Sequence, residues 1–266
     1  MTIPLEAAAR ARFPEVCRFP LLDSTNEEVR RRIDAGTCRC GLVVLADRQT
    51  NGRGRLGRTW ASPAGNLHIS FARRLDEPSH LTTAMTLVAG QALAQAVEQA
   101  SGLRPSIKWP NDLQLRGRKL AGILVEGHRG WQIIGAGVNV GIDLSELPED
   151  LRSKATSLRL HLASPPEPSA LAARYLEAFI SHEAGLLRRG ALNMELWSRY
   201  WGDRGRRVTA WLGQVPLEGV PEEVTALGVL RLRDDEGRLH DIRSGEILHL
   251  RHHSEYDEGR RDVPGD

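Results

Sequence analysis

A loop rich in glycine and arginine limits the folds that this chain can adopt. The apolar run 42–46 (LVVLA) predicts a buried strand, and residues 52–59 (GRGRLGRT) follow it closely. Gly52, Gly54 and Gly57 match G-x-G-x-x-G, and the loop also matches a Walker loop except that Arg58 replaces the lysine. Both motifs need a helix that begins at the loop and holds phosphate at its N-terminus. Residues 60–65 (WASPAG) do not begin a helix, so we reject the Rossmann and P-loop folds.

The loop could still bind an anion by a different geometry. Glycines let backbone amides approach an anion closely. Arginines supply charge and paired donors for a carboxylate or a phosphate. The alternative is an ordinary solvated basic loop, and the loop alone does not separate these two interpretations.

The rest of the chain mixes helical and strand-like segments in a pattern that favours an α+β fold. Helices are predicted over 24–35, 81–100, 169–189 and 191–201, and strands over 66–72, 112–115, 119–126 and 131–138. Ser24 and Glu27 have capping-box spacing at the first helix. The last three strands form a meander, which predicts a largely antiparallel sheet. Short alternating runs over 207–250 predict a small β-barrel.

Charge and cysteine content exclude several classes of protein. The formal net charge of +2 is too balanced for a nucleic-acid-binding face. No apolar stretch is long enough to span a membrane, and residues 1–20 lack the apolar core of a signal peptide. Cysteines 17, 38 and 40 are too few for a disulfide framework or a four-ligand zinc site. We therefore expect a cytoplasmic protein, and we assign no metal ligands.

Lysine is rare in this chain. Only Lys108, Lys119 and Lys154 are lysine among the 36 basic residues. A GC-rich genome explains the bias toward arginine. A lysine retained against that bias is nevertheless a candidate for chemistry that the planar guanidinium performs poorly.

Several segments together resemble the biotin protein ligase family. They are 23–26 (DSTN), 49–55 (QTNGRGR), 108–112 (KWPND), 118–124 (RKLAGIL), 135–139 (GAGVN) and 155–158 (ATSL). They occur in the family's order and spacing, and the resemblance extends over roughly 22–250. It implies a catalytic domain like that of class II synthetases, with a mixed, largely antiparallel sheet, followed by an SH3-like β-barrel. We expect the catalytic domain over 1–203, the barrel over 204–253 and a disordered tail over 254–266.

The resemblance also implies a role for each motif residue. Biotin would be bound by Ser24, Thr25, Asn26, Gln49, Gly52, Arg53, Gly54, Arg55 and Lys119. The nucleotide would contact Arg53, Arg55, Arg58, Trp60 and Asn139. The expected catalytic residues are Lys119, Asp112 and Arg55, with Asp112 orienting or deprotonating the incoming lysine. Simpler interpretations remain open, because Ser24 could be a plain helix cap and Trp60 an ordinary core residue.

The implied reaction has two steps and uses ATP, biotin and Mg²⁺. Biotin and ATP would form biotinoyl-5′-AMP, and biotin would then pass to a lysine of a biotin carboxyl carrier protein. Joining a carboxylate to a phosphate brings two anions together, so cations must be in place beforehand. Lys119 and the arginines of the loop could supply them. A lysine amine, with an ordinary pKa of ~10.4, is mostly protonated at neutral pH, which gives a carboxylate such as Asp112 a use.

Two other functions stay open at this point. A lipoate or octanoate protein ligase or transferase would share the catalytic fold, although the arginine-rich loop and the C-terminal barrel favour biotin. A nucleic-acid-binding regulator would need a wider basic surface and a reading helix. The active-site pattern begins at Asp23, which leaves too little room for three helices of ~11–12 residues each before it. We therefore expect a ligase without repressor function, with no DNA or membrane partner, and a homodimer is left open.

Overall fold

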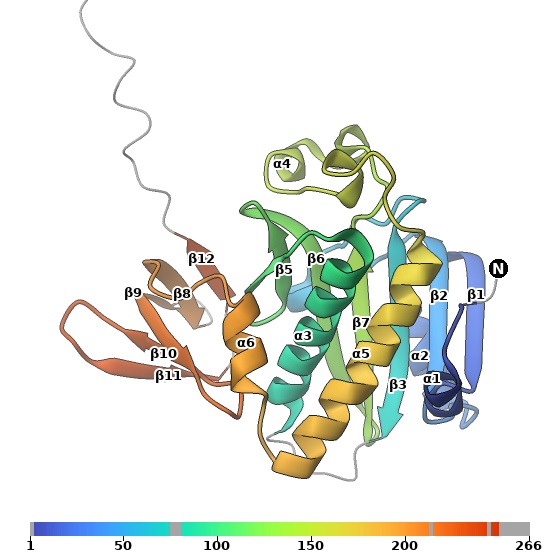
Figure 1. The fold of residues 1–266 in the computed structure, drawn as a ribbon, viewed down its shortest axis with the longest axis horizontal. Helices are drawn as coiled ribbons and strands as arrows, with labels where there is room; N and C mark the ends of the chain where they lie inside the picture. Colours follow the sequence, from blue (N-terminus) through green and yellow to red (C-terminus); the bar gives the residue numbers. More distant parts are fainter. Residues whose placement is uncertain (1–2, 75–80, 213–214, 244–245, 250–266) are drawn as a thin grey trace, which may run out of the picture.

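The computed structural model describes residues 3–74, 81–212, 215–243 and 246–249. It contains a seven-stranded sheet and a five-stranded sheet (Figure 1). The expected disordered tail, 254–266, lies outside the described residues. None of the described helices is both long and apolar enough to cross a membrane.

The larger sheet has the strand order β1-β2-β3-β7-β6-β5-β4. Its strands are β1 (Glu15–Leu22), β2 (Leu42–Gln49), β3 (Leu67–Arg74), β4 (Ser106–Lys108), β5 (Asp112–Leu115), β6 (Arg118–His128) and β7 (Trp131–Val138). β1 and β2 are parallel, and all the other neighbouring pairs are antiparallel. The mixed, largely antiparallel sheet predicted from the sequence is therefore confirmed, including the meander of β5, β6 and β7.

Helices cover both faces of this sheet. α3 (Leu81–Ser101) and α5 (Pro168–Arg189) lie side by side across one face (Figure 1). α2 (Thr25–Asp34) covers part of the other face, where its Val29 and Ile33 pack against β2 and β3. α3 is apolar nearly throughout because it lies between the sheet and α5. It ends at Gly102, whose positive φ of 71° suits the glycine that the sequence places there.

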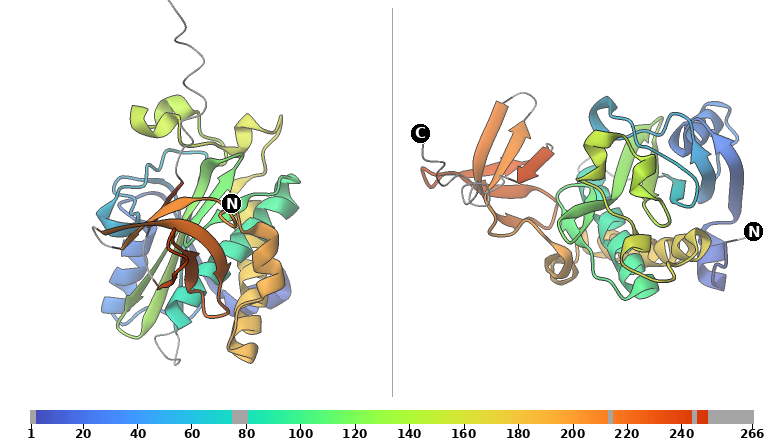
Figure 2. Two further views of the ribbon diagram at one scale, coloured as in Figure 1. Left: turned by 90° about the vertical axis from the view of Figure 1, so that its left-hand side faces the viewer. Right: turned by 90° about the horizontal axis from the view of Figure 1, so that it is seen from above.

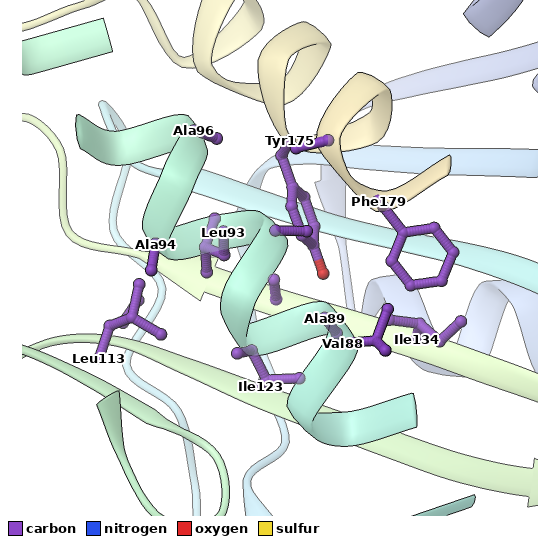
Figure 3. Packing of buried hydrophobic residues seen from close by; sticks show 14 of the residues in the cluster. Val88, Ala89, Leu93, Ala94, Ala96, Leu113, Ile123, Ile134, Tyr175 and Phe179 are labelled. Atoms are coloured by element: carbon purple, nitrogen blue, oxygen red, sulfur yellow. The ribbon is translucent and has the colours of Figure 1, made fainter. Parts of the chain in front are cut away.

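The main core lies between the larger sheet, α3 and α5. Figure 3 shows Tyr175 and Phe179 of α5 together with Val88, Ala89 and Leu93 of α3. Phe71 of β3 makes edge-to-face contacts with both aromatic rings of α5, at centroid distances of 5.8 Å to Tyr175 and 4.7 Å to Phe179. The helices α3 and α5 bury one face of the larger sheet. A binding site can therefore form only on the other face, around α2.

The second sheet is antiparallel, with the order β11-β10-β9-β8-β12 (Figure 2). Its strands are β8 (Val208–Leu212), β9 (Val215–Val224), β10 (Leu230–Arg233), β11 (Leu239–Ile242) and β12 (Glu246–His249). It is reached through α6 (Met194–Tyr200), which is shorter than the predicted helix over 191–201 because Asn193 caps its start. The predicted small β domain is confirmed, while its SH3-like closure and the boundary at 203/204 stay predictions.

Short helices complete the fold. They are α1 (Ala7–Arg12) and α4 (Glu149–Arg152), with the 3-10 turns η1 (Arg55–Gly57), η2 (Leu144–Glu146) and η3 (Leu158–Leu160). The first turn lies inside the glycine- and arginine-rich loop. No α-helix follows it there, and the next element is β3, which agrees with rejecting the Rossmann and P-loop folds.

Candidate active site

A pocket opens where the start of α2, the glycine- and arginine-rich loop, β6 and β7 meet. It encloses about 480 Å³, a volume that includes open solvent at its mouth. Nine of the expected site residues line it: Ser24, Thr25, Asn26, Gln49, Arg53, Gly54, Arg55, Trp60 and Lys119. The lining also includes Asn111, Gly122, Ile123, Leu124, Gly135, Ala136 and Gly137, to which we assigned no role. All seven stand inside the motifs 108–112, 118–124 and 135–139.

The floor of the pocket is a buried set of hydroxyl and amide groups. Thr25 donates from its backbone N (2.7 Å) and from Oγ1 (3.1 Å) to Gln49 Oε1. Ser70 Oγ lies 2.7 Å from Thr25 Oγ1 and 2.5 Å from Asn26 Oδ1. Asn26 Nδ2 donates to Glu126 Oε2 at 2.7 Å. These bonds fix the orientation of each group before any ligand arrives, and the sequence analysis missed Ser70 and Glu126.

The capping box expected at α2 is wrong, although the helix begins where predicted. Ser24 is the N-cap, but its side chain makes no capping hydrogen bond. Its backbone N instead donates to Asp23 Oδ1 at 2.7 Å, and Arg31 holds the same carboxylate. The hydrogen bonds from Arg31 lower the pKa of Asp23 from 3.8 to about 2. The Ser24 hydroxyl therefore remains at the pocket instead of capping the helix.

Glycines on β6 and β7 let other side chains approach the sheet closely. A Cβ at Gly135 would lie 2.2 Å from Asn26 Oδ1, and one at Gly137 would lie 2.4 Å from Trp60 Nε1. A Cβ at Gly122 would lie 3.2 Å from the Trp60 ring. Larger residues at the first two positions would displace Asn26 and Trp60. The glycines of this strand pair therefore shape the pocket wall.

The glycine- and arginine-rich loop folds back on itself as a hairpin. Gly54 N donates to Arg58 O (2.7 Å), and Trp60 N donates to Gly52 O (2.8 Å). At its tip, Leu56 has a positive φ of 55° and is 77% exposed. The tip thus exposes an apolar side chain to solvent, while Arg53, Gly54 and Arg55 line the pocket.

Two cationic side chains stand at the pocket wall. Lys119 Nζ forms an ion pair with Asp112 Oδ1 at 2.8 Å and lies 5.4 Å from the centroid of the Trp60 ring. Arg55 Nη1 donates to Asn111 Oδ1 at 3.0 Å. A third cation, Arg53, lies against carboxylates of α2 and β6.

Arg53 is held by carboxylates near the start of α2. It is hydrogen bonded to Glu27 and lies 3.0 Å from Glu126 Oε1, which Arg30 also contacts at 3.1 Å. Arg53 therefore faces the carboxylates of Glu27 and Glu126. At the pocket wall, Lys119 faces the carboxylate of Asp112, and Arg55 faces the side-chain amide of Asn111.

Four expected site residues lie outside the pocket lining. Asp112 touches the pocket through Lys119, and Gly52 forms the base of the loop. Arg58 is exposed on the loop. Asn139 is buried, and its Nδ2 donates to Thr156 O at 3.0 Å. The structure thus gathers the expected biotin residues closely and leaves the expected nucleotide residues more dispersed.

Comparisons with known proteins agree with this geometry. Residues 18–143 match the Biotin/lipoate A/B protein ligase family. The chain is 32% identical over 241 residues to the biotin–[acetyl-CoA-carboxylase] ligase of Mycobacterium tuberculosis, covering 86% of each protein. The chain belongs to the biotin protein ligase family of enzymes.

Two further biotin protein ligases extend the comparison. The chain is 33% identical over 214 residues to the bifunctional ligase/repressor BirA of Bacillus subtilis, covering 78% of this chain but only 66% of that protein. The biotin protein ligase of Aquifex aeolicus, solved in complex with biotin and ATP, superposes with a TM-score of 0.79 at 28% identity. That match covers 90% of this chain and all of the Aquifex chain, so it includes both sheets.

Proposed function

We propose that this protein activates biotin with ATP as biotinoyl-5′-AMP and transfers it to a lysine of a biotin carboxyl carrier protein. The observation that carries the proposal is the pocket itself. It joins a floor of fixed hydroxyl and amide groups to a wall that holds Lys119 and Arg55. A polar ring system with hydrogen-bonding edges suits the floor, and a carboxylate suits the wall. The Aquifex relative, solved with biotin and ATP, supports this assignment.

In the first step a carboxylate oxygen of biotin attacks the α-phosphorus of ATP, and pyrophosphate leaves. Lys119 Nζ is placed to offset the charge shared by the carboxylate and the phosphate, and Arg55 adds a second cation. Mg²⁺ would arrive on the triphosphate, a mode in which substrate phosphates supply much of the coordination. Among the described residues, no group of three or more His, Cys, Asp and Glu side chains could hold a metal ion.

In the second step the acceptor amine attacks the acyl carbon of the adenylate, and AMP leaves. The amine must first lose a proton. Asp112 lies 2.8 Å from Lys119 Nζ, so its carboxylate is next to the place where the acyl phosphate would form. We assign Asp112 the task of orienting or deprotonating the acceptor lysine. Arg53, Arg58, Trp60 and Asn139 remain the proposed nucleotide contacts.

Other parts of the proposal concern the setting of the reaction. We place it in the cytoplasm with the carrier domain as protein partner, and we propose no DNA partner. The catalytic unit would span 1–203, and the SH3-like barrel 204–253. Lipoate is the competing substrate, because the matched family includes ligases for both compounds.

A substrate comparison tests the proposal. The purified protein is incubated with Mg²⁺-ATP and either biotin or lipoate, and pyrophosphate release and the mass of an added carrier domain are measured. Biotin should give pyrophosphate release and a single mass increment on the carrier domain. Modification by lipoate with none by biotin would overturn the assignment. Titration with duplex DNA provides the third arm, and sequence-specific binding that resists salt would contradict the absence of a DNA partner.

A further inference from the structure

The connection between β4 and β5 links the pocket to two distant parts of the chain. It is residues 109–111, and its far end carries Asn111 and then Asp112, the first residue of β5. Only one residue separates Trp109 from Asn111. Whatever fixes Trp109 therefore also limits where Asn111 and Asp112 can lie.

Trp109 is held by groups far from it in the sequence. It is 1% exposed, and its backbone N donates to Asp203 Oδ2 at 2.7 Å. Its indole Nε1 donates to Gly228 O at 3.1 Å. Asp203 is fully buried and lies between α6 and β8, while Gly228 lies in the turn between β9 and β10 of the second sheet. One residue is thus bonded both to the link between the sheets and to the second sheet.

A neighbouring contact strengthens the same attachment. Gly202 N donates to Ile107 O at 2.9 Å, and a Cβ at Gly202 would lie 2.9 Å from the Ser106 side chain. The segment between α6 and β8, residues 201–207, therefore lies directly against β4 at Gly202. It approaches so closely that only glycine fits at this position without a shift.

The opposite end of the connection is bonded to the pocket. Asn111 Nδ2 donates to Ile123 O (3.1 Å), and Ile123 N donates to Asn111 O (2.9 Å). These bonds leave Asn111 Oδ1 to accept from Arg55, at 3.0 Å. Asp112 pairs with Lys119. The chain from Gly228 to the reacting groups thus consists of hydrogen bonds and one short stretch of backbone.

We propose that Asp203 and Trp109 are positioning residues for the transfer step. Asp203 fixes the backbone at Trp109, and the indole bond to Gly228 ties that backbone to the second sheet, so that Asp112 is held where the acceptor amine must lose its proton. The inference rests on the proposed ligase function. Lys119 has separate support, because its backbone N and O bond to Lys154 O and Thr156 N at 2.8 and 2.9 Å. Loss of Asp203 should therefore affect transfer more than adenylate formation.

Substitution of Asp203 tests this separation of the two steps. A misplacement of about 1 Å at a reacting group costs on the order of a hundredfold in rate. Asp203→Ala should slow single-turnover transfer from preformed adenylate by about tenfold or more, with less than about threefold change in pyrophosphate release. Asp203→Asn retains an oxygen that can accept from Trp109 N, and it should restore transfer to within about threefold of the original rate. Equal slowing of both steps, or no rescue by Asn, would overturn the positioning role.

A pair of tryptophan substitutions tests the link to the second sheet. Trp109→Phe removes the bond to Gly228 O, whereas Trp197→Phe removes an equally buried indole whose Nε1 has no hydrogen-bond partner within the described ranges. Trp109→Phe should slow transfer by about three- to tenfold, and Trp197→Phe by less than about twofold. Equal effects would overturn the inference, and this comparison still decides it if Asp203→Ala does not fold. If the unmodified protein forms no adenylate, the proposed function has failed instead.

Discussion

The floor of the pocket and the glycine- and arginine-rich loop differ in how their side chains are held. On the floor, Thr25 and Asn26 at the start of α2 are each 4% exposed, and both are hydrogen bonded to side chains of the larger sheet. In the loop, Leu56 is 77% exposed at the tip, and Arg55 is partly exposed and bonded to a neutral amide. The floor needs little rearrangement to bind a ligand. Any further ordering of the loop over a ligand would cost roughly 1–2 kcal/mol per residue fixed.

The difference suggests separate tasks for the two regions. A preorganised floor selects the ligand, because its donors and acceptors cannot turn to suit another molecule. A loop with charged donors retains what has bound, because charge-assisted hydrogen bonds can offset the ordering cost at ~1.5–3 kcal/mol each. Changes to the floor should therefore alter affinity and selectivity. Changes to the loop should alter how long the adenylate stays.

Of the substitutions that compare the floor with the loop, one that fills the floor should have the larger effect. In Gly135→Ala the new Cβ would lie 2.2 Å from Asn26 Oδ1, so Asn26 must leave its bonds to Ser70 and Glu126. Overpacking costs about 1–3 kcal/mol, which corresponds to a rise of about five- to 150-fold in the biotin dissociation constant measured by calorimetry. Gly127→Ala is the matched control, because a Cβ there meets nothing within 4 Å. Similar affinities for the two variants would contradict the description of the floor.

A change in the loop should leave binding nearly intact but release the intermediate. Arg55→Gly removes the bond to Asn111 and a cation beside the pocket. We expect Arg55→Gly still to form adenylate, because Lys119 remains, but to release it about tenfold faster, because one charge-assisted bond is worth ~1.5–3 kcal/mol. Incubation with biotin, ATP and serum albumin, followed by a streptavidin blot, detects the escape as labelled albumin. Albumin labelling no stronger than with the unmodified protein would show that this arginine does not retain the adenylate.

A third prediction concerns the pH dependence of stability beside the floor. His68 lies on β3 two residues before Ser70 and is 1% exposed, and burial lowers its pKa from 6.5 to about 4. It therefore stays neutral when the unfolded chain becomes protonated. Protonation of His68 in the unfolded chain therefore lowers the free energy of unfolding as the pH falls from 6.5 toward 4. The folded protein is not destabilised in this way above pH 6.5, and at pH 5 the loss is roughly 2 kcal/mol.

Thermal unfolding of His68→Gln at pH 7 and pH 5 tests this burial. Glutamine retains a donor for Ala46 O, which His68 Nδ1 approaches at 3.3 Å, but it cannot titrate in this range. The variant should lose less stability between the two pH values than the unmodified protein. His182, whose burial also lowers its pKa to about 4, remains in both proteins and accounts for residual pH dependence. An identical pH dependence in the two proteins would mean that His68 is hydrated.

Helices and strands with a strong hydrophobic period were predicted from the sequence. Strands that form only because a neighbouring strand lies beside them were missed. β1 reads EVCRFPLL, has no clean alternation, and forms a strand because β2 lies beside it. β4 has three residues and is too short to give a pattern. Ser70 was missed although it alternates with buried apolar residues on β3 and thus faces the α2 side of the sheet. Its bond to Asn26 joins residues 44 positions apart, which a single sequence does not show.

Substitution of Lys119 tests the central claim, that this pocket forms an acyl adenylate. Lys119→Arg keeps the charge but replaces a compact ammonium with a planar fork where a carboxylate and a phosphate must meet. Lys154→Arg is the matched control, since Lys154 is exposed and does not line the pocket. Biotin-dependent pyrophosphate release should fall by about a hundredfold or more in Lys119→Arg and remain unchanged in Lys154→Arg, while both proteins unfold at the same temperature. Turnover of Lys119→Arg close to that of the unmodified protein would contradict the account.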